Sequence, residues 1–226
     1  MKVSVLMATY NRNYIIDRAL SSLRDQSIKD FELIEINEGK SVLDKLSGLN
    51  YKYIQCPCKT TLPNALNMGF KIAEGEFITF LDDDDILYPN ALIDMLSGFT
   101  DESIMTIYAN VRREFTKIGK IEIFPNRDLM RSMGNVLNQN WACNCAKMYR
   151  HDALFQSNAF DRCKSTYLED WEYSLAVIQK FGINSCKYIN KIVGEVYVTD
   201  KSMTTNGNGI MDTEANMVRR EYGSIR

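Results

Sequence analysis

Short apolar runs alternate with amphipathic stretches through the first half of the chain. The runs lie at residues 3–7, 31–36, 51–55 and 77–81. They are too short for buried helices and are typical of strands inside a parallel sheet. Apolar residues recur at helical spacing between and after these runs, at residues 15–23, 65–72 and 91–96. This alternation predicts an α/β fold with a mostly parallel central sheet flanked by helices.

Residues with known helix preferences mark where two of these helices begin. Asn11 or Asn13 is expected to cap the first helix, because a short polar side chain satisfies free N–H groups at a helix start. Pro89 is expected to open the helix at residues 91–96.

The second half of the chain predicts a small antiparallel element and further helices. Residues 103–110 and 120–124 are expected to pair as an antiparallel hairpin. A helix is expected to begin near His151, and another near Leu168. Residues 192–205 are expected to form a last strand and a polar loop, before an amphipathic helix that ends the chain. The lone histidine at a helix start favours a capping or surface role over catalysis.

Polar residues follow three of the predicted strands. These segments are Thr9–Asn11, Asn37–Gly39 and Asp82–Asp85. Ligands of parallel sheets bind at the carboxyl ends of the strands, where the loops converge. The three strand ends therefore predict a binding site on one edge of the sheet.

The four consecutive aspartates Asp82–Asp85 allow two interpretations. Hard divalent cations such as Mg²⁺ or Mn²⁺ prefer carboxylate oxygens and often share their ligands with substrate phosphates. Alternatively, the run is a solvated acidic turn that ends a strand. Residue types alone do not separate these two interpretations.

Composition and charge limit the possible classes of protein. The chain has 226 residues, of which 45% are hydrophobic and 25% charged, as in soluble globular proteins. A net charge of −2 argues against non-specific nucleic-acid binding as the main activity. No apolar run has the length of a membrane span, and the first residues do not resemble a signal peptide. A cytoplasmic location is the resulting expectation.

The six cysteines include two C-x-C pairs, Cys56 with Cys58 and Cys143 with Cys145. Four thiolates could bind zinc, but this spacing is weaker evidence than the C-x₂-C of structural zinc sites. Free, partly buried thiols are the favoured interpretation.

Four segments together resemble glycosyltransferase family 2. They are VSVLMATYNR, FELIEINEGKS, NALNMGFKIAEGEFITFLDDDD and LEDWEYSLAVIQKFG, and the resemblance extends over residues 3–200. It implies the GT-A fold and a metal-dependent, inverting transferase that uses Mn²⁺ or Mg²⁺. Such an enzyme moves a sugar from a nucleoside diphosphate, by family habit UDP, to an acceptor hydroxyl. The Gln-x-x-Arg-Trp motif of processive synthases is absent from the sequence, which favours transfer of a single sugar.

The resemblance also divides the chain by role. We expect one domain over residues 1–226, with a nucleotide-sugar-binding half at 1–100 and an acceptor and catalytic half at 101–200. Residues 201–226 would form a lid, with Gly207, Asn208 and Gly209 flexible, and a helix. The acceptor is expected to be a glycan, a lipid-linked sugar or another hydroxyl compound, and a nucleic-acid acceptor is not favoured.

On the donor side, Thr9, Tyr10 and Asn11 match the family's loop around the nucleotide base. Glu38 stands where the family has the second Asp of its Asp-Asp-Gly-Ser turn, and Asn37 stands where it has the first.

A donor-side helix follows the third strand. Asn67 matches a position of that helix in the family. Leu66 replaces an arginine that many members use for the diphosphate.

The acidic run matches the family's Asp-x-Asp pair. By resemblance, Asp82 lies towards the ribose and the metal, Asp84 binds the metal, and Asp83 supports them. Solvated side chains are the favoured expectation for Asp83 and Asp85. Asp200 lies near the place of a metal-binding histidine in relatives, and it is a candidate third ligand.

Asp170 matches the Asp of the family's Glu-Asp pair, which is the general base. Inverting transfer needs one carboxylate that removes the proton of the acceptor hydroxyl. Glu169 and Glu172 are expected to raise its basicity through charge repulsion. Acidic residues are also favoured in a first helical turn for structural reasons alone. The alternative function is a sugar-nucleotide-binding protein with little or no turnover, which the changes at Asn37, Glu38 and Leu66 would permit.

Overall fold

The computed structural model describes residues 2–124, 140, 143–199, 202 and 208–223. Its strands are β1 (Val3–Thr9), β2 (Phe31–Asn37), β3 (Tyr51–Gln55), β4 (Phe77–Phe80), β5 (Ile86–Leu87), β6 (Thr106–Phe115), β7 (Lys120–Phe124), β8 (Lys147–Arg150) and β9 (Cys186–Val198). Its α-helices are α1 (Asp17–Arg24), α2 (Leu62–Phe70), α3 (Ala91–Leu96), α5 (His151–Gln156), α6 (Ala159–Arg162), α7 (Glu169–Phe181) and α9 (Asn208–Tyr222). Short 3₁₀ turns are η1 (Leu43–Lys45), η3 (Asn144–Ala146) and η4 (Ile183–Ser185).

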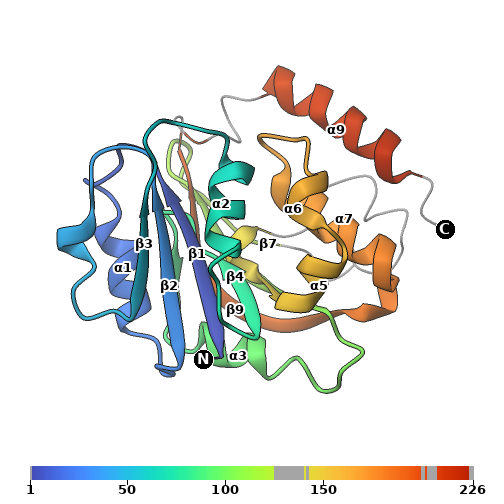
Figure 1. Cartoon of the computed structure of the whole chain (residues 1–226), viewed down its shortest axis with the longest axis horizontal. Coiled ribbons are helices and arrows are strands. Elements are labelled where there is room, and N and C mark those ends of the chain that lie inside the picture. The colour runs from blue at the N-terminus through green and yellow to red at the C-terminus, as the bar shows by residue number, and fades with distance from the viewer. Residues whose placement is uncertain (1, 125–139, 141–142, 200–201, 203–207, 224–226) are drawn as a thin grey trace.

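The described strands form one nine-stranded sheet in the order β3-β2-β1-β4-β8-β6-β9-β5, with β7 paired to β6. The first four strands in this order are parallel, as the sequence predicts. β8 joins β4 and β6 through antiparallel pairs, and β6 and β9 are again parallel. Figure 1 shows β3, β2, β1 and β4 side by side at one end of the molecule, and α5, α6, α7 and α9 grouped at the other. The α/β fold with antiparallel pairs in its second half is confirmed.

Two apolar clusters cover the two faces of the sheet. One cluster joins the sheet to α2, α5, α6, α7 and α9, and the other joins it to α1 and α3. Successive residues of β1 alternate between them, because side chains of a strand point to opposite faces. Leu6 belongs to the first cluster, and Val5 and Met7 belong to the second. Helices on both faces therefore bury both sides of the parallel strands.

The helix cap predicted at Asn11 or Asn13 is wrong. α1 begins only at Asp17, with Ile16 at its N-cap position and no side-chain cap. Asn11 instead has a positive φ of 54°, and its side-chain oxygen accepts a hydrogen bond from the Lys40 N–H at 3.0 Å. It connects two loops, because its short polar side chain tolerates this backbone geometry.

Three element boundaries also differ from the prediction. β6 runs to Phe115 rather than 110, because it pairs along its length with β9. β9 begins at Cys186, earlier than residue 192, for the same reason. Asn208 and Gly209 belong to α9 rather than to a flexible loop, and Gly207 lies outside the described residues.

None of the helices in the described part of the chain has the length and apolar character that a membrane crossing requires. The six cysteines are unpaired. The single histidine does not cap α5 through its side chain. Its Nδ1 lies 3.0 Å from the Gly75 carbonyl oxygen, and its ring lies against Phe70. His151 thus connects α5 to the segment before β4.

Candidate active site

The polar ends of β1, β2 and β4 meet at one edge of the sheet. β1 lies between the other two strands, and Thr9 is paired with Asn37 in the parallel register. The acidic turn, residues 82–85, follows β4 directly and is closed by a hydrogen bond from the Asp85 N–H to the Asp82 carbonyl at 3.1 Å. The three segments that the sequence placed at one edge are therefore neighbours.

The side chains of the acidic turn alternate between buried and partly exposed. Asp83 and Asp85 are 3% and 4% exposed, whereas Asp82 is half-buried and the Asp84 side chain is 20% exposed. The solvated turn predicted for Asp83 and Asp85 is therefore wrong. β5 pairs with β9 directly after the turn, and the Tyr197 N–H of β9 donates to Asp85 Oδ1 at 3.3 Å. These contacts hold the acidic turn against β9.

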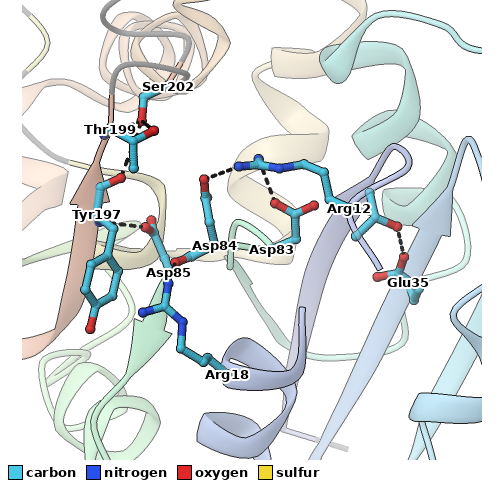
Figure 2. Close-up of polar contacts among 10 residues, drawn as sticks. Arg12, Arg18, Glu35, Asp83, Asp84, Asp85, Tyr197, Thr199 and Ser202 are labelled. Carbon is cyan, nitrogen blue, oxygen red and sulfur yellow. Dashed lines mark hydrogen bonds and ion pairs between the residues drawn. The ribbon is translucent and has the colours of Figure 1, made fainter. Parts of the chain in front are cut away.

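Two arginines face the acidic turn, and the sequence analysis identified neither. Arg12 Nη1 lies 2.8 Å from Asp83 Oδ1, and its Nη2 pairs with the carboxylate of Asp84. Arg18 donates to the Asp84 carbonyl at 3.3 Å and stacks on the Tyr197 ring at 4.1 Å. Figure 2 shows both guanidinium groups pointing at the turn. The signal available in the sequence was an arginine directly after Asn11 in the first polar strand end.

Burial disfavours the ionised form of three carboxyl groups in the acidic turn. Burial raises the pKa of Asp82 to about 7, helped by the charges of Asp84 and Asp170. Burial also raises the pKa of Asp83 to about 7, against the opposing charge of Arg12. For Asp85, burial and the charge of Asp82 raise the pKa well above its ordinary value. A bound cation would favour the ionised forms.

The turn fits a hard divalent cation. Asp82 and Asp84 are the partly exposed residues of the turn, and Asp83 Oδ2 is buried without a hydrogen-bond partner. Mg²⁺ is commonly held by one or two carboxylates, with phosphates and water completing its shell. Within the described residues, no group of three His, Cys, Asp or Glu side chains converges as a metal site. The predicted third ligand, Asp200, lies outside the described residues.

A buried polar network supports the loop after β1. Thr9 donates to the carboxyl group of Glu35, and Asn37 Nδ2 donates to Thr9 Oγ1 at 2.8 Å. All three side chains are at most 2% exposed. Burial raises the pKa of Glu35 to about 8, although the hydrogen bond from Thr9 opposes this. Thr9 and Asn37 therefore use their side chains inside the protein, where they fix the shape of the loop.

Tyr10 and Glu38 are the first residues after β1 and β2. Tyr10 is 41% exposed, and Lys59 Nζ lies 4.3 Å from the centre of its ring. Glu38 Oε1 accepts a hydrogen bond from the Thr60 N–H at 2.6 Å, which connects the turn after β2 to the segment before α2. Tyr10 thus offers a partly exposed aromatic ring directly after β1.

Asn67 does not contact the acidic turn in the described structure. Its side-chain amide donates to Asp161 Oδ1 at 3.3 Å and thereby links α2 to α6. Its neighbour Leu66 is buried in the core cluster with α7. A cationic contact from position 66 is therefore replaced by apolar packing, and the cations near the turn come from Arg12 and Arg18 instead.

Asp170 lies in the first turn of α7 and accepts hydrogen bonds from three residues. Asn140 Nδ2 lies 2.9 Å and 2.7 Å from its two carboxylate oxygens. The Trp171 N–H donates to Oδ1 at 2.8 Å, and Lys147 Nζ donates to Oδ2 at 3.1 Å. Its charge also contributes to the raised pKa of Asp82. The 3₁₀ turn η3 connects the acidic turn to the first turn of α7, because Cys145 Sγ lies 4.0 Å from Asp85 Oδ2 and Asn144 Nδ2 donates to Glu169 Oε1 at 3.3 Å. The predicted base and the acidic turn therefore share one site.

The two acidic neighbours of Asp170 differ in their surroundings. Glu172 Oε2 accepts hydrogen bonds from the Lys164 and Ser165 N–H groups at 2.9 and 2.6 Å. Burial and the charge of Asp170 raise the pKa of Glu169 well above its ordinary value. A cation, Lys147, is the charged partner in direct contact with Asp170.

The chain is similar to known proteins in both sequence and fold. The model of the family described as glycosyl transferase family 2 matches residues 4–162. The chain is 35% identical to the poly(ribitol-phosphate) β-N-acetylglucosaminyltransferase TarP of Staphylococcus aureus over 87% of its own length and 62% of that protein. It is also 35% identical to a GalNAc(5)-diNAcBac-PP-undecaprenol β-1,3-glucosyltransferase of Campylobacter jejuni, over 48% of the chain and 38% of that protein. The chain spans between 30% and 62% of the length of the first four curated relatives.

Solved structures with the same fold include two with bound sugar nucleotides. S. aureus TarS 1-349 in complex with UDP-GlcNAc matches 87% of this chain and 58% of its own, with a TM-score of 0.69 and 21% identity. Glucosyl-3-phosphoglycerate synthase of Mycobacterium tuberculosis, in complex with Mn²⁺, UDP-glucose and phosphoglyceric acid, matches all of this chain and 80% of its own. Its TM-score is 0.68 at 13% identity. These matches confirm the expected GT-A fold.

Proposed function

The chain belongs to glycosyl transferase family 2, and on that premise we propose that it transfers a single sugar from a nucleoside diphosphate sugar to an acceptor hydroxyl, with inversion at the anomeric carbon. The observation that carries this proposal is the connection that η3 makes between the acidic turn and the first turn of α7, which carries Asp170. The acidic turn would hold the cation and the donor diphosphate on one side of the anomeric carbon. The carboxylate of Asp170 would face the acceptor hydroxyl on the other side.

On the donor side, Asp84 and Asp82 would hold Mn²⁺ or Mg²⁺ together with the diphosphate. When bound, the ion neutralises the charge that develops on the leaving diphosphate. Tyr10 lies at the opening of the loop with an exposed ring that a base can stack on. Asn11 and Glu38 fix the two loops around it. UDP is the proposed donor nucleotide, in keeping with the UDP-bound neighbours of the same fold.

On the acceptor side, Asp170 would accept the proton of the attacking hydroxyl. The acceptor oxygen forms a bond to the anomeric carbon while the bond from that carbon to the diphosphate oxygen breaks. The proton moves to Asp170, and the nucleoside diphosphate leaves with the electron pair. We propose a glycan, a lipid-linked sugar or a polyol-phosphate polymer as the acceptor, because the named relatives include transferases to such compounds.

A second candidate function is donor binding without turnover. It is favoured by Arg12, which pairs with Asp84 where a metal ion would bind, and by Leu66, which is buried in the core.

The two candidates separate in an assay of UDP-sugar hydrolysis and transfer with Mn²⁺. Asp170→Asn is expected to lower kcat on the order of 10³-fold, the usual contribution of a general base. Its affinity for UDP, measured by calorimetry, should be unchanged. Glu169→Gln is the matched control, because it removes the neighbouring carboxyl group of the same helical turn and leaves Asp170 in place. Full turnover in Asp170→Asn would refute the role of the base, and UDP binding without turnover in the unmodified protein would favour the second candidate.

A further inference from the structure

Lys147 carries a charged group into the protein interior beside Asp170. It lies in β8, between β4 and β6, and is 1% exposed. A buried ammonium group is costly unless an opposite charge and hydrogen bonds compensate it. Its Nζ donates to the backbone carbonyl of Asp170 at 2.9 Å and to Asp170 Oδ2 at 3.1 Å. Both contacts are with the residue proposed as the base.

These two contacts hold the carboxylate relative to the backbone of α7. The first connects Lys147 to the main chain of the first helical turn, and the second connects it to the side chain. The backbone of Lys147 is itself tied to the donor side, because Thr79 Oγ1 donates to its carbonyl at 2.7 Å. Thr79 lies in β4, just before the acidic turn. Lys147 therefore links the strand that carries the acidic turn to the carboxylate of Asp170.

The hydrogen bonds of Asp170 are of two kinds. Those from Lys147 and the Trp171 N–H come from a buried strand and from the helix itself. The third donor, Asn140, contacts both oxygens from a part-buried position. A carboxylate has about four acceptor positions, so a further donor must replace one that is present.

We propose that Lys147 is a positioning residue for the transfer reaction: it is the permanent counter-ion that keeps Asp170 aimed at the acceptor hydroxyl, which donates in place of Asn140. This inference rests on the proposed function. Lys147 itself contacts neither substrate nor metal. Its effect is on the orientation and charge of the carboxylate, and it should therefore change kcat rather than donor binding.

The test compares Lys147→Met with Lys52→Met. Lys52 lies in β3, the first strand in the order of the sheet, and its Nζ is 3.0 Å from Oε2 of the buried Glu32. Lys147→Met is expected to lower kcat on the order of 10²-fold, as a small misplacement of a reacting group does. The KM for the donor and the affinity for UDP should stay unchanged. Lys52→Met should lower stability and leave kcat unchanged. Full kcat in Lys147→Met would overturn the proposal.

A rescue experiment separates positioning from a purely structural role. Lys147→Ala leaves room for a small cation, so propylammonium should restore part of its kcat and should not affect the unmodified protein. Absence of rescue in a folded Lys147→Ala protein would count against the proposal.

Failure of the proposed function is distinguishable from failure of this inference. If the unmodified protein has no turnover, crystal structures of it and of Lys147→Met decide the matter. The carboxylate of Asp170 should turn away from the Trp171 N–H in the variant, and an unmoved carboxylate would overturn the proposal.

Discussion

Asp84 keeps a fifth of its side chain exposed while Arg12 pairs with its carboxylate. A guanidinium group and a divalent cation compensate the same negative charge, so they compete for this oxygen. The exposure of Asp84 leaves room for the exchange, whereas the 3% exposure of Asp83 does not. The alternation within four aspartates gives the acidic turn an accessible side, where the proposed ion would bind, and a buried side.

Asp84→Asn should weaken Mn²⁺ binding in the presence of UDP, on the order of tenfold or more, because an amide is a poorer ligand than a carboxylate. Calorimetric titration of Mn²⁺ into the UDP-bound protein measures this effect. Asp94 lies on α3 and forms an ion pair with Lys191. Asp94→Asn is the control and should bind Mn²⁺ normally. Equal affinities in the two variants would exclude Asp84 as a metal ligand.

Glu35 predicts a pH dependence of stability. Burial raises its pKa from 4.5 to about 8, so between these values the folded protein holds a proton that the unfolded chain has lost. The unfolding free energy contributed by Glu35 therefore falls as pH rises through this window. Glu35→Gln removes the titration. The variant should gain on the order of a few kcal/mol relative to the unmodified protein between pH 5 and 8, as measured by urea unfolding.

Glu32, on the same strand, gives the opposite sign and serves as the control. Burial alone would raise its pKa, but hydrogen bonds from Ser4 and the Glu74 N–H, with the charge of Lys52, lower it. Glu32→Gln should therefore lose stability above the unfolded pKa and regain it in acid. A flat difference between Glu35→Gln and the unmodified protein across pH 5 to 8 would show that Glu35 is ionised in the folded state.

At the scale of elements, the loop after β1 and the turn after β2 pack closely. A Cβ added at Gly39 would lie 2.7 Å from the Asn11 backbone nitrogen, which no real Cβ tolerates. Gly39→Ala should therefore displace the loop that carries Tyr10 and Arg12. We expect a loss of about 1–3 kcal/mol in stability, typical of overpacking, and roughly tenfold weaker UDP binding, measured by calorimetry.

Gly119→Ala is the matched control for this substitution. Gly119 has a positive φ of 63°, and no atom lies within 4 Å of an added Cβ. The change strains the turn between β6 and β7 and should lower stability, with UDP affinity unchanged. Weaker UDP binding in Gly119→Ala, or normal binding in Gly39→Ala, would contradict the assignment of these loops to the donor site.

The elements with regular apolar patterns, and the edge where three of their polar ends meet, could be predicted from the sequence, but the distant contacts that bury the acidic turn could not. β3 is observed at its predicted residues, Tyr51–Gln55. Asp85 is held by β9, more than a hundred positions away, through the Tyr197 N–H. Lys147 has no local signal that pairs it with Asp170, because a strand and a helix that are distant in sequence bring them together.

At the scale of the whole molecule, the two core clusters cover the faces of the sheet, and the candidate site lies at its edge. The apolar clusters bury both faces of the sheet away from the candidate metal site, so we expect the proposed ion to support donor binding rather than the fold. Removing the ion should therefore weaken donor binding and leave the stability of the protein without donor unchanged.

EDTA alone should leave the melting temperature unchanged, because the apolar clusters do not depend on an ion. UDP with Mn²⁺ at about 100 times its Kd should stabilise the fold by about 2.7 kcal/mol, which is roughly 5–10 °C for a chain of this size. EDTA added with UDP should remove most of that gain, because Asp82 and Asp84 would then face the diphosphate without a cation between them. Differential scanning fluorimetry measures all three conditions, and the Asp84→Asn variant should show a smaller Mn²⁺-dependent gain. A gain that survives EDTA in full would mean that Arg12 and Arg18, rather than a metal ion, hold the diphosphate against the sheet.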